Sequence, residues 1–194
     1  MDIARFEKTK INKVNSAEET IKILDRISSK WIDIVTDRIN QIPDKVLDDF
    51  IDQCIATNPN KKEFRIYQYF IEPRIKDTHV ILTYYKEDAD IFSFGNNSMR
   101  LTEEEAEILR NNPDAVKAAG YSTYCTLIEM DDRKRHKLFY NMIAPVIENR
   151  FKRYGVKITA YDITYSQLLI YIKNPLYKSK LDIVTENIKK AFEK

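Results

Sequence analysis

The side chains best suited to catalysis or metal binding are few in this chain and form no recognised motif. The two histidines, His79 and His136, have no histidine or cysteine close in the sequence, so no zinc-ligand spacing is present. His79 begins a predicted strand and His136 lies in a basic run, and neither is paired by the sequence with a nucleophile. We therefore predict that the protein is not an enzyme and has no catalytic or metal-binding residues.

Clusters of acidic residues could hold a divalent cation in a nuclease or phosphotransferase, which makes a metal-dependent enzyme the third hypothesis. Hard cations need oxygen ligands that converge from several elements, whereas a run on one helix face or at a helix N-terminus is favoured by solvent and by the helix dipole. The clusters are Glu103, Glu104, Glu105 and Glu107; Glu87, Asp88 and Asp90; Asp48, Asp49 and Asp52; and Asp131 with Asp132.

Glycine is scarce, and this scarcity excludes several functional classes. The three glycines, Gly95, Gly120 and Gly155, stand too far apart to form GxGxxG, GxxxxGK[ST] or GxSxG. These are the fingerprints of dinucleotide-binding proteins, nucleoside triphosphatases and many hydrolases, because glycine lets the backbone approach a phosphate or adopt a positive φ. No cofactor is predicted.

The strongest local charge signal is a basic run at residues 133–137. On a helix over residues 131–154, Lys134, Lys137 and Lys152 share the polar face, as a row of phosphate contacts would require. Glu148 lies among them and opposes an anionic ligand. Nucleic-acid binding through these three lysines is therefore the alternative hypothesis, and a solvated helix face is preferred.

Twelve tyrosines, many of them in predicted strands, allow two interpretations. Tyr67 and Tyr171 occur near Arg65 and Lys173, a combination that could stack RNA bases on a sheet. No RNP-type motif accompanies them, since that motif needs glycines. Tyrosine also suits core and protein interfaces, where one end is dry and the hydroxyl is hydrated, and this interpretation is favoured.

Composition bounds the class of protein. The chain has 194 residues, 43% of them hydrophobic, and 32 basic against 30 acidic residues, which gives no global attraction to nucleic acid or anionic membrane. No apolar run has membrane-spanning length and the first residues do not resemble a secretory signal, so we expect an intracellular protein with Cys54 and Cys125 as reduced core residues. The abundant isoleucine, lysine and asparagine are typical of AT-rich genomes and suggest phage or mobile-element origin.

Hydrophobic periodicity predicts an α+β fold with an N-terminal helical hairpin, a mostly antiparallel sheet packed by helices and a C-terminal β-α-β-β-α unit. Asn58-Pro59-Asn60 is a turn cluster that divides an N-terminal arm and hairpin (1–58) from an α+β domain (59–194), unless the two form one continuous domain. Helices are expected at 16–41 behind a capping box that begins at Ser16, at 44–57 after Pro43, and at 131–154 with a kink at Pro145. Further helices are expected from 103 behind a capping box that begins at Thr102, from 113 with proline at its first position, and from 174. Strands are expected at 64–72, 78–85, 91–94, 121–129, 156–162 and 167–173.

Three segments of this pattern bear on partners. Residues 1–15 are predicted to form an extended arm with Phe6 as an anchor, and the helix that follows has a second apolar line, Ile21, Ile32 and Ile39, beyond its core stripe around Trp31. The last helix is expected to turn Leu181, Val184, Ile188 and Phe192 inward. We therefore predict a non-enzymatic binding or structural protein, part of a larger assembly, whose partner is another protein or a second copy.

Overall fold

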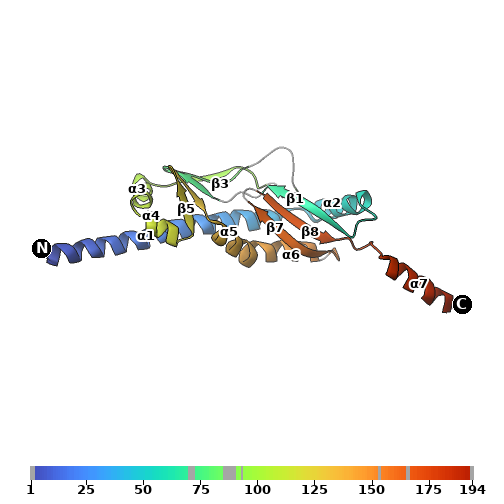
Figure 1. Ribbon diagram of the computed structural model, residues 1–194. Coiled ribbons are helices and arrows are strands. Elements are labelled where there is room, and N and C mark those ends of the chain that lie inside the picture. Colours follow the sequence, from blue (N-terminus) through green and yellow to red (C-terminus); the bar gives the residue numbers. More distant parts are fainter. Residues whose placement is uncertain are drawn as a thin grey trace.

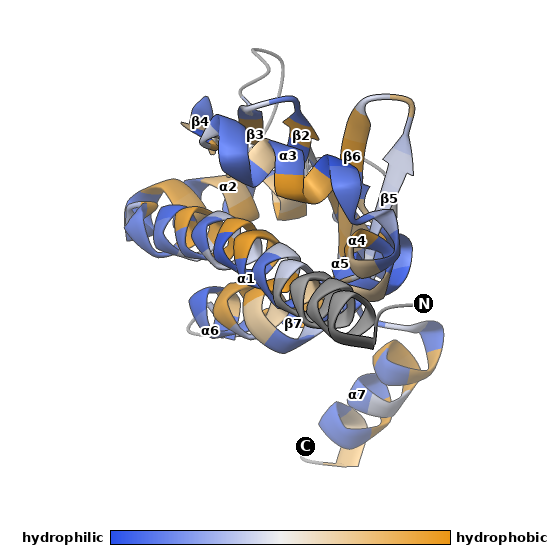
Figure 2. Cartoon of the chain, turned by 90° about the vertical axis from the view of Figure 1, so that its left-hand side faces the viewer, coloured by the Kyte–Doolittle hydropathy of each residue, from blue (hydrophilic) through white to orange (hydrophobic). Residues whose placement is uncertain are grey.

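A computed structural model describes residues 3–69, 73–84, 91–92, 94–152, 154–164 and 167–192, without the side chains of residues 3–15, 69 and 164. It confirms the α+β class: long helices combine with sheets in which every strand pairing described is antiparallel (Figure 1). The helix α1 (Ile3–Gln41) runs through the molecule as an axis. Viewed along α1, one sheet lies above it and α6 (Ala144–Lys152) lies below it (Figure 2).

The expected N-terminal arm is wrong, because residues 3–15 are helical and belong to α1. No glycine or proline interrupts this segment, so the helix propagates through it. The predicted cap at Ser16 is correspondingly absent. The Ser16 hydroxyl instead accepts a hydrogen bond from the Asn112 amide at the start of α4, which ties the middle of α1 to another helix.

The shorter helices agree well with their sequence signals. After Pro43, α2 (Asp44–Thr57) buries Leu47 and Ile51. A capping box between Thr102 and Glu105 begins α3 (Glu103–Asn111), and proline at the first position begins α4 (Pro113–Ala118).

The strands form two sheets rather than one. The three-stranded sheet has the order β1-β8-β7, with β1 (Glu63–Tyr69), β8 (Gln167–Lys173) and β7 (Lys157–Thr164). The five-stranded sheet has the order β4-β3-β2-β6-β5, with β4 (Asn97–Arg100), β3 (His79–Thr83), β2 (Arg74–Lys76), β6 (Leu127–Met130) and β5 (Tyr121–Tyr124).

Three strand predictions need correction. The connection before β3 contains the unpredicted strand β2, and the strand expected at 91–94 is replaced by β4, while Phe92 is a buried core residue. The strand expected at 121–129 is a hairpin of two strands, β5 and β6. The rest of the C-terminal β-α-β-β-α unit follows in the expected order. Cys125 sits at the turn with φ 53° and is exposed, not buried in a strand core. Since cysteine seldom adopts a positive φ, the sequence carried no turn signal there.

The long helix expected at 131–154 is interrupted. It consists of α5 (Asp132–Leu138), a π-helical turn (Phe139–Ile143) and α6, which begins one residue before Pro145. Proline has no N–H and its ring collides with the carbonyl four residues earlier, so the preceding turn widens. The expected kink thus takes the form of a π-turn.

Buried residues from both predicted domains belong to one hydrophobic cluster. It includes Leu24 and Trp31 of α1, Leu47 of α2, Ile75 of β2 and Ile170 of β8, all with 1% exposure or less. Trp31 is fully buried, as expected. Within the molecule α1 contacts α3, α4, α6 and β3 of the five-stranded sheet.

The C-terminal helix α7 (Lys180–Phe192) lies at the opposite end of the molecule from the N-terminus (Figure 1) and has no buried residue. Its apolar stripe does not face inward as expected. The reason lies at Asn174, which is buried and whose amide donates to the carbonyls of Asn58 and Lys61. The chain is fixed there at the end of β8, and α7 begins six residues later, capped by Ser179.

Candidate functional site

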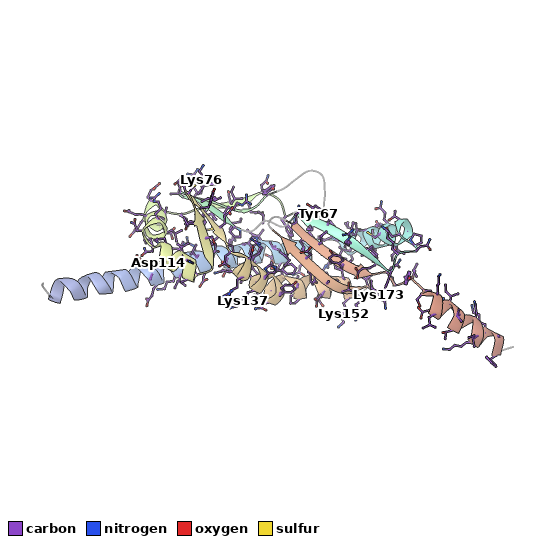
Figure 3. All side chains as sticks on the ribbon, viewed as in Figure 1. Tyr67, Lys76, Asp114, Lys137, Lys152 and Lys173 are labelled. Carbon is purple, nitrogen blue, oxygen red and sulfur yellow. The ribbon has the colours of Figure 1, made fainter. Side chains whose placement is uncertain are left out.

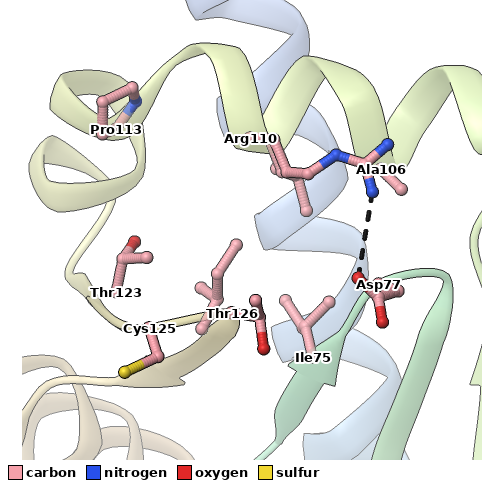
Figure 4. A pocket seen from close by; sticks show the side chains of 10 residues that line it. Ile75, Asp77, Ala106, Arg110, Pro113, Thr123, Cys125 and Thr126 are labelled. Carbon is pink, nitrogen blue, oxygen red and sulfur yellow. Dashed lines mark ion pairs between the residues drawn. The ribbon is translucent and has the colours of Figure 1, made fainter.

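A small cavity lies between α3, α4 and the turns of two hairpins (Figure 4). Its volume is about 150 Å³ and its floor is mainly apolar, with Ile75 and Ile128 from neighbouring strands. At its rim Arg110 lies 3.9 Å from Asp77. The cavity could hold a small apolar group, but its lining offers the Cys125 thiol no imidazole as a general base.

The histidines occupy places with different roles. The Nδ1 atom of His136 lies 2.7 Å from the Asp132 carbonyl oxygen and its ring stacks on Tyr140, so His136 is a structural residue of α5. His79 is exposed at the start of β3, as its position in the sequence predicts. The strand β2 separates it from β6 and the adjoining turn that carries Cys125.

The acidic clusters are largely engaged in local structure. Glu105 caps α3 and pairs with Arg26 at 2.8 Å, Asp131 accepts from the backbone of α5, and Asp49 pairs with Lys45. The cluster at residues 87–90 lies outside the described residues. Across the part of the chain that the structure describes, no three acidic, histidine or cysteine side chains converge in a way that could hold a metal ion.

The basic helix is divided between structural and free lysines. Lys134 is not available to phosphate as predicted: its side chain is 15% exposed, its Nζ donates to Asp25 and Ala119, and it lies 5.0 Å above the Tyr121 ring centroid. Lys134 packs inward because Gly120 lets the backbone approach it closely. Of the three predicted lysines, Lys137 and Lys152 are exposed, and they lie along the lower side of the molecule in Figure 3.

The predicted partner line on α1 is only partly at the surface. Ile21 is exposed and Ile32 is half-buried. Ile39 is fully buried in the hydrophobic core and offers no surface to a partner. The Phe6 side chain lies outside the described residues, and its role as an anchor stays a prediction.

The outer face of the three-stranded sheet gathers several of the tyrosines and basic residues noted above. Strand register places Arg65 opposite Tyr171, Tyr67 opposite Leu169 and Glu63 opposite Lys173. Tyr67 is exposed, and Figure 3 shows it on the same sheet as Lys173. Lys157 is opposite Lys173 on the other side, so Glu63 balances two lysines in that row.

The helix α7 carries an uncovered apolar stripe. At 100° per residue its four members fall within a quarter of the helix circumference, and all are at least half exposed. The opposite side carries Lys190 and Glu186, which pair with each other at 3.5 Å. The residues of this α7 stripe are Leu181, Val184, Ile188 and Phe192.

Sequence periodicity found the α7 stripe but assigned it to the core. The pattern of an amphipathic helix is the same whether its apolar face packs on its own chain or on another one. Which of the two applies to α7 depends on where β8 ends and on the direction of the chain after it, and periodicity does not report either.

Comparison with models of known families, with curated proteins and with solved structures found no match to this chain. Among the helices described, none combines the length and the apolar character needed to cross a bilayer.

Proposed function

We propose that this protein is a non-enzymatic component of a larger assembly and that it binds another protein, or a second copy of itself, through the α7 stripe. The observation that carries the proposal is the uncovered row Leu181, Val184, Ile188 and Phe192, the last of them 88% exposed. A continuous apolar surface of this kind on a soluble domain marks an interaction site, because leaving it in water costs free energy.

The length of α7 supports the same conclusion. Helices shorter than roughly 12 to 15 residues are marginal in water when they are isolated, and α7 has 13 residues with none buried. Two local interactions, the Ser179 cap and the ion pair between Lys178 and Glu186, stabilise α7 only modestly. A partner that covers the stripe would supply the missing stabilisation, in the manner of an amphipathic helix seated in a groove.

The first turns of α1 extend beyond the body at the other end of the molecule (Figure 1). This arrangement leaves two helical projections available for contacts with neighbours in an assembly. The prediction that Phe6 takes part in such a contact is consistent with its place in that projection.

The experiment compares two substitutions on the same helix. Ile188→Asp disrupts the α7 stripe, whereas Ile183→Asp is its matched control, since Ile183 is on the opposite side and has nearly the same exposure (46% against 51%). Light scattering coupled to size exclusion measures self-association, and co-purification from the native source measures partner binding. We expect Ile188→Asp to lose the oligomer or the partner and Ile183→Asp to keep it, with unchanged melting of the body.

Equal masses and equal co-purified proteins for the wild type and Ile188→Asp would refute this proposal.

Nucleic-acid binding through the helix 131–154 is the less favoured function. The Lys134 side chain packs inside the structure, so only two of the three predicted lysines, Lys137 and Lys152, are exposed to a phosphate.

A further inference from the structure

The outer face of the five-stranded sheet carries a row of side chains that no other feature of the molecule explains. Register places Lys76 of β2 directly opposite His79 of β3, and His79 directly opposite Arg100 of β4. On the other side Lys76 is opposite Leu127 of β6, which is opposite Tyr124 of β5. The five residues therefore form one row across all five strands.

This face is open to solvent. Lys76, His79, Arg100 and Tyr124 are exposed, with Tyr124 at 77%. Ile81, one residue pair further along β3, is 38% exposed although strands flank it on both sides. Among the described residues, nothing covers the outer face of the sheet there.

The row contains hydrogen-bond donors and cations but no carboxylate in register. Lys76 and Arg100 are the two cations of the row, and His79 lies between them, directly opposite both. In the three-stranded sheet a carboxylate in register balances such charges, because Glu63 is opposite Lys173. In the row Lys76, His79 and Arg100, no described residue in register performs this role.

Two acidic groups close to the row are already paired. Glu129 lies on the adjacent row and its carboxylate is 3.1 Å from Arg74. Asp77 lies in the turn between Lys76 and His79 and is paired with Arg110 at the cavity rim. Neither carboxylate is in register with the row, which leaves Lys76 and Arg100 to complement an external anion.

From this arrangement we infer that the outer face of the five-stranded sheet binds single-stranded nucleic acid. Lys76 and Arg100 would contact phosphates, and His79 would donate a hydrogen bond between them. The Tyr124 ring would stack on a base at the β5 end of the row, with Leu127 as the apolar surface between it and Lys76. A single strand fits better than a duplex, because only unpaired bases expose a face for stacking. This site is separate from α7 and does not depend on the proposed assembly function.

The test is fluorescence anisotropy with labelled oligo-uridine and oligo-thymidine of about 12 nucleotides, and with a duplex of the same length, at several salt concentrations. With two cationic phosphate contacts and a slope of about −0.7 for each on a single strand, we expect the logarithm of the association constant to fall with the logarithm of salt with a slope of about −1.4. Lys76→Gln combined with Arg100→Gln should bring this slope close to zero. Tyr124→Ala should weaken binding about tenfold, and Tyr124→Phe should restore it.

Two pairs of substitutions serve as controls, and thermal melting verifies that every variant is folded. Lys137→Gln with Lys152→Gln removes the exposed lysines of the basic helix, and Lys157→Gln with Lys173→Gln removes those of the other sheet. Neither pair should change the affinity by more than about twofold. The inference is overturned if wild type does not bind at low salt, if a control pair abolishes binding while the Lys76 and Arg100 pair does not, or if polyglutamate binds as tightly as the oligonucleotides and Tyr124→Ala has no effect.

Discussion

The hydroxyl oxygens of Ser28 and Tyr121 lie 2.7 Å apart in the buried interior and join α1 to β5. The Leu24 carbonyl oxygen lies 3.0 Å from the Ser28 hydroxyl and 3.3 Å from the Tyr121 hydroxyl. Since each hydroxyl has one proton, one of the two donates to the other hydroxyl, which in turn donates to the carbonyl. The polar atoms at this crossing thus satisfy one another where water is excluded, and Tyr121 in turn supports Lys134 above its ring.

Ser28→Ala and Tyr121→Phe should each lower the free energy of unfolding by about 1 kcal/mol, because each removes one buried hydrogen bond while the other group keeps the Leu24 carbonyl. The double variant tests whether the two hydroxyls act as a pair. We expect a coupling energy of about 0.5 to 1.5 kcal/mol in a double-mutant cycle measured by urea denaturation. Strict additivity would show that the contact contributes nothing.

Alkaline pH should destabilise the protein through its buried tyrosines. Burial raises the pKa of Tyr121, and burial together with the nearby Glu148 carboxylate raises the pKa of Tyr161. The unfolded chain then loses these protons from about pH 10 upward while the folded protein keeps them, so the unfolded state binds fewer protons and stability falls.

For Tyr121 this loss amounts to as much as about 1.4 kcal/mol for each pH unit above about 10. Tyr121→Phe has no proton to lose and should show a shallower decline than wild type in urea unfolding at about pH 9, 10 and 11. An identical pH dependence of the two proteins would contradict the assignment.

Gly120→Ala should be more destabilising than Gly155→Ala, although both glycines have positive φ. A Cβ at Gly120 would lie 2.9 Å from Cβ and Cδ of Lys134, whereas a Cβ at Gly155 would meet nothing within 4 Å. The left-handed conformation alone costs about 1 to 2 kcal/mol for alanine. Overpacking against Lys134 should add about 1 to 3 kcal/mol at Gly120. Equal melting temperatures for the two variants would show that Lys134 moves aside without cost.

Gln68→Leu should lower the free energy of unfolding by about 2 to 4 kcal/mol. The buried Gln68 amide donates to the Phe92 carbonyl at 2.8 Å and accepts from the Phe92 N–H at 3.1 Å, so its loss leaves two buried backbone groups unpaired. Gln53→Leu on the exposed side of α2 is the control and should change stability by less than about 0.5 kcal/mol. Faster hydrogen exchange of the Phe92 amide in Gln68→Leu would locate the effect.

Some of the fold could be predicted because its signals are local. The capping box Thr102–Glu105, proline at the start of α4 and the alternating strands β7 and β8 depend on neighbours within a few residues. The row formed by Lys76, His79 and Arg100 has no local signal of this kind. It joins residues of three strands through pairings between separate segments, and the sequence pattern predicts neither β2 nor β4.

By itself, the sequence determined the α+β class, the absence of glycine-rich phosphate loops, the buried Trp31 and the amphipathic character of the last helix. Periodicity reports only that a helix has an apolar side. The tertiary structure decided which sides face outward: Ile39 is covered, the α7 stripe is not, and Lys134 points inward over Tyr121. The physical reason is that burial depends on contacts between distant segments, such as the Asn174 hydrogen bonds to the loop before β1, and no local pattern encodes where those segments meet.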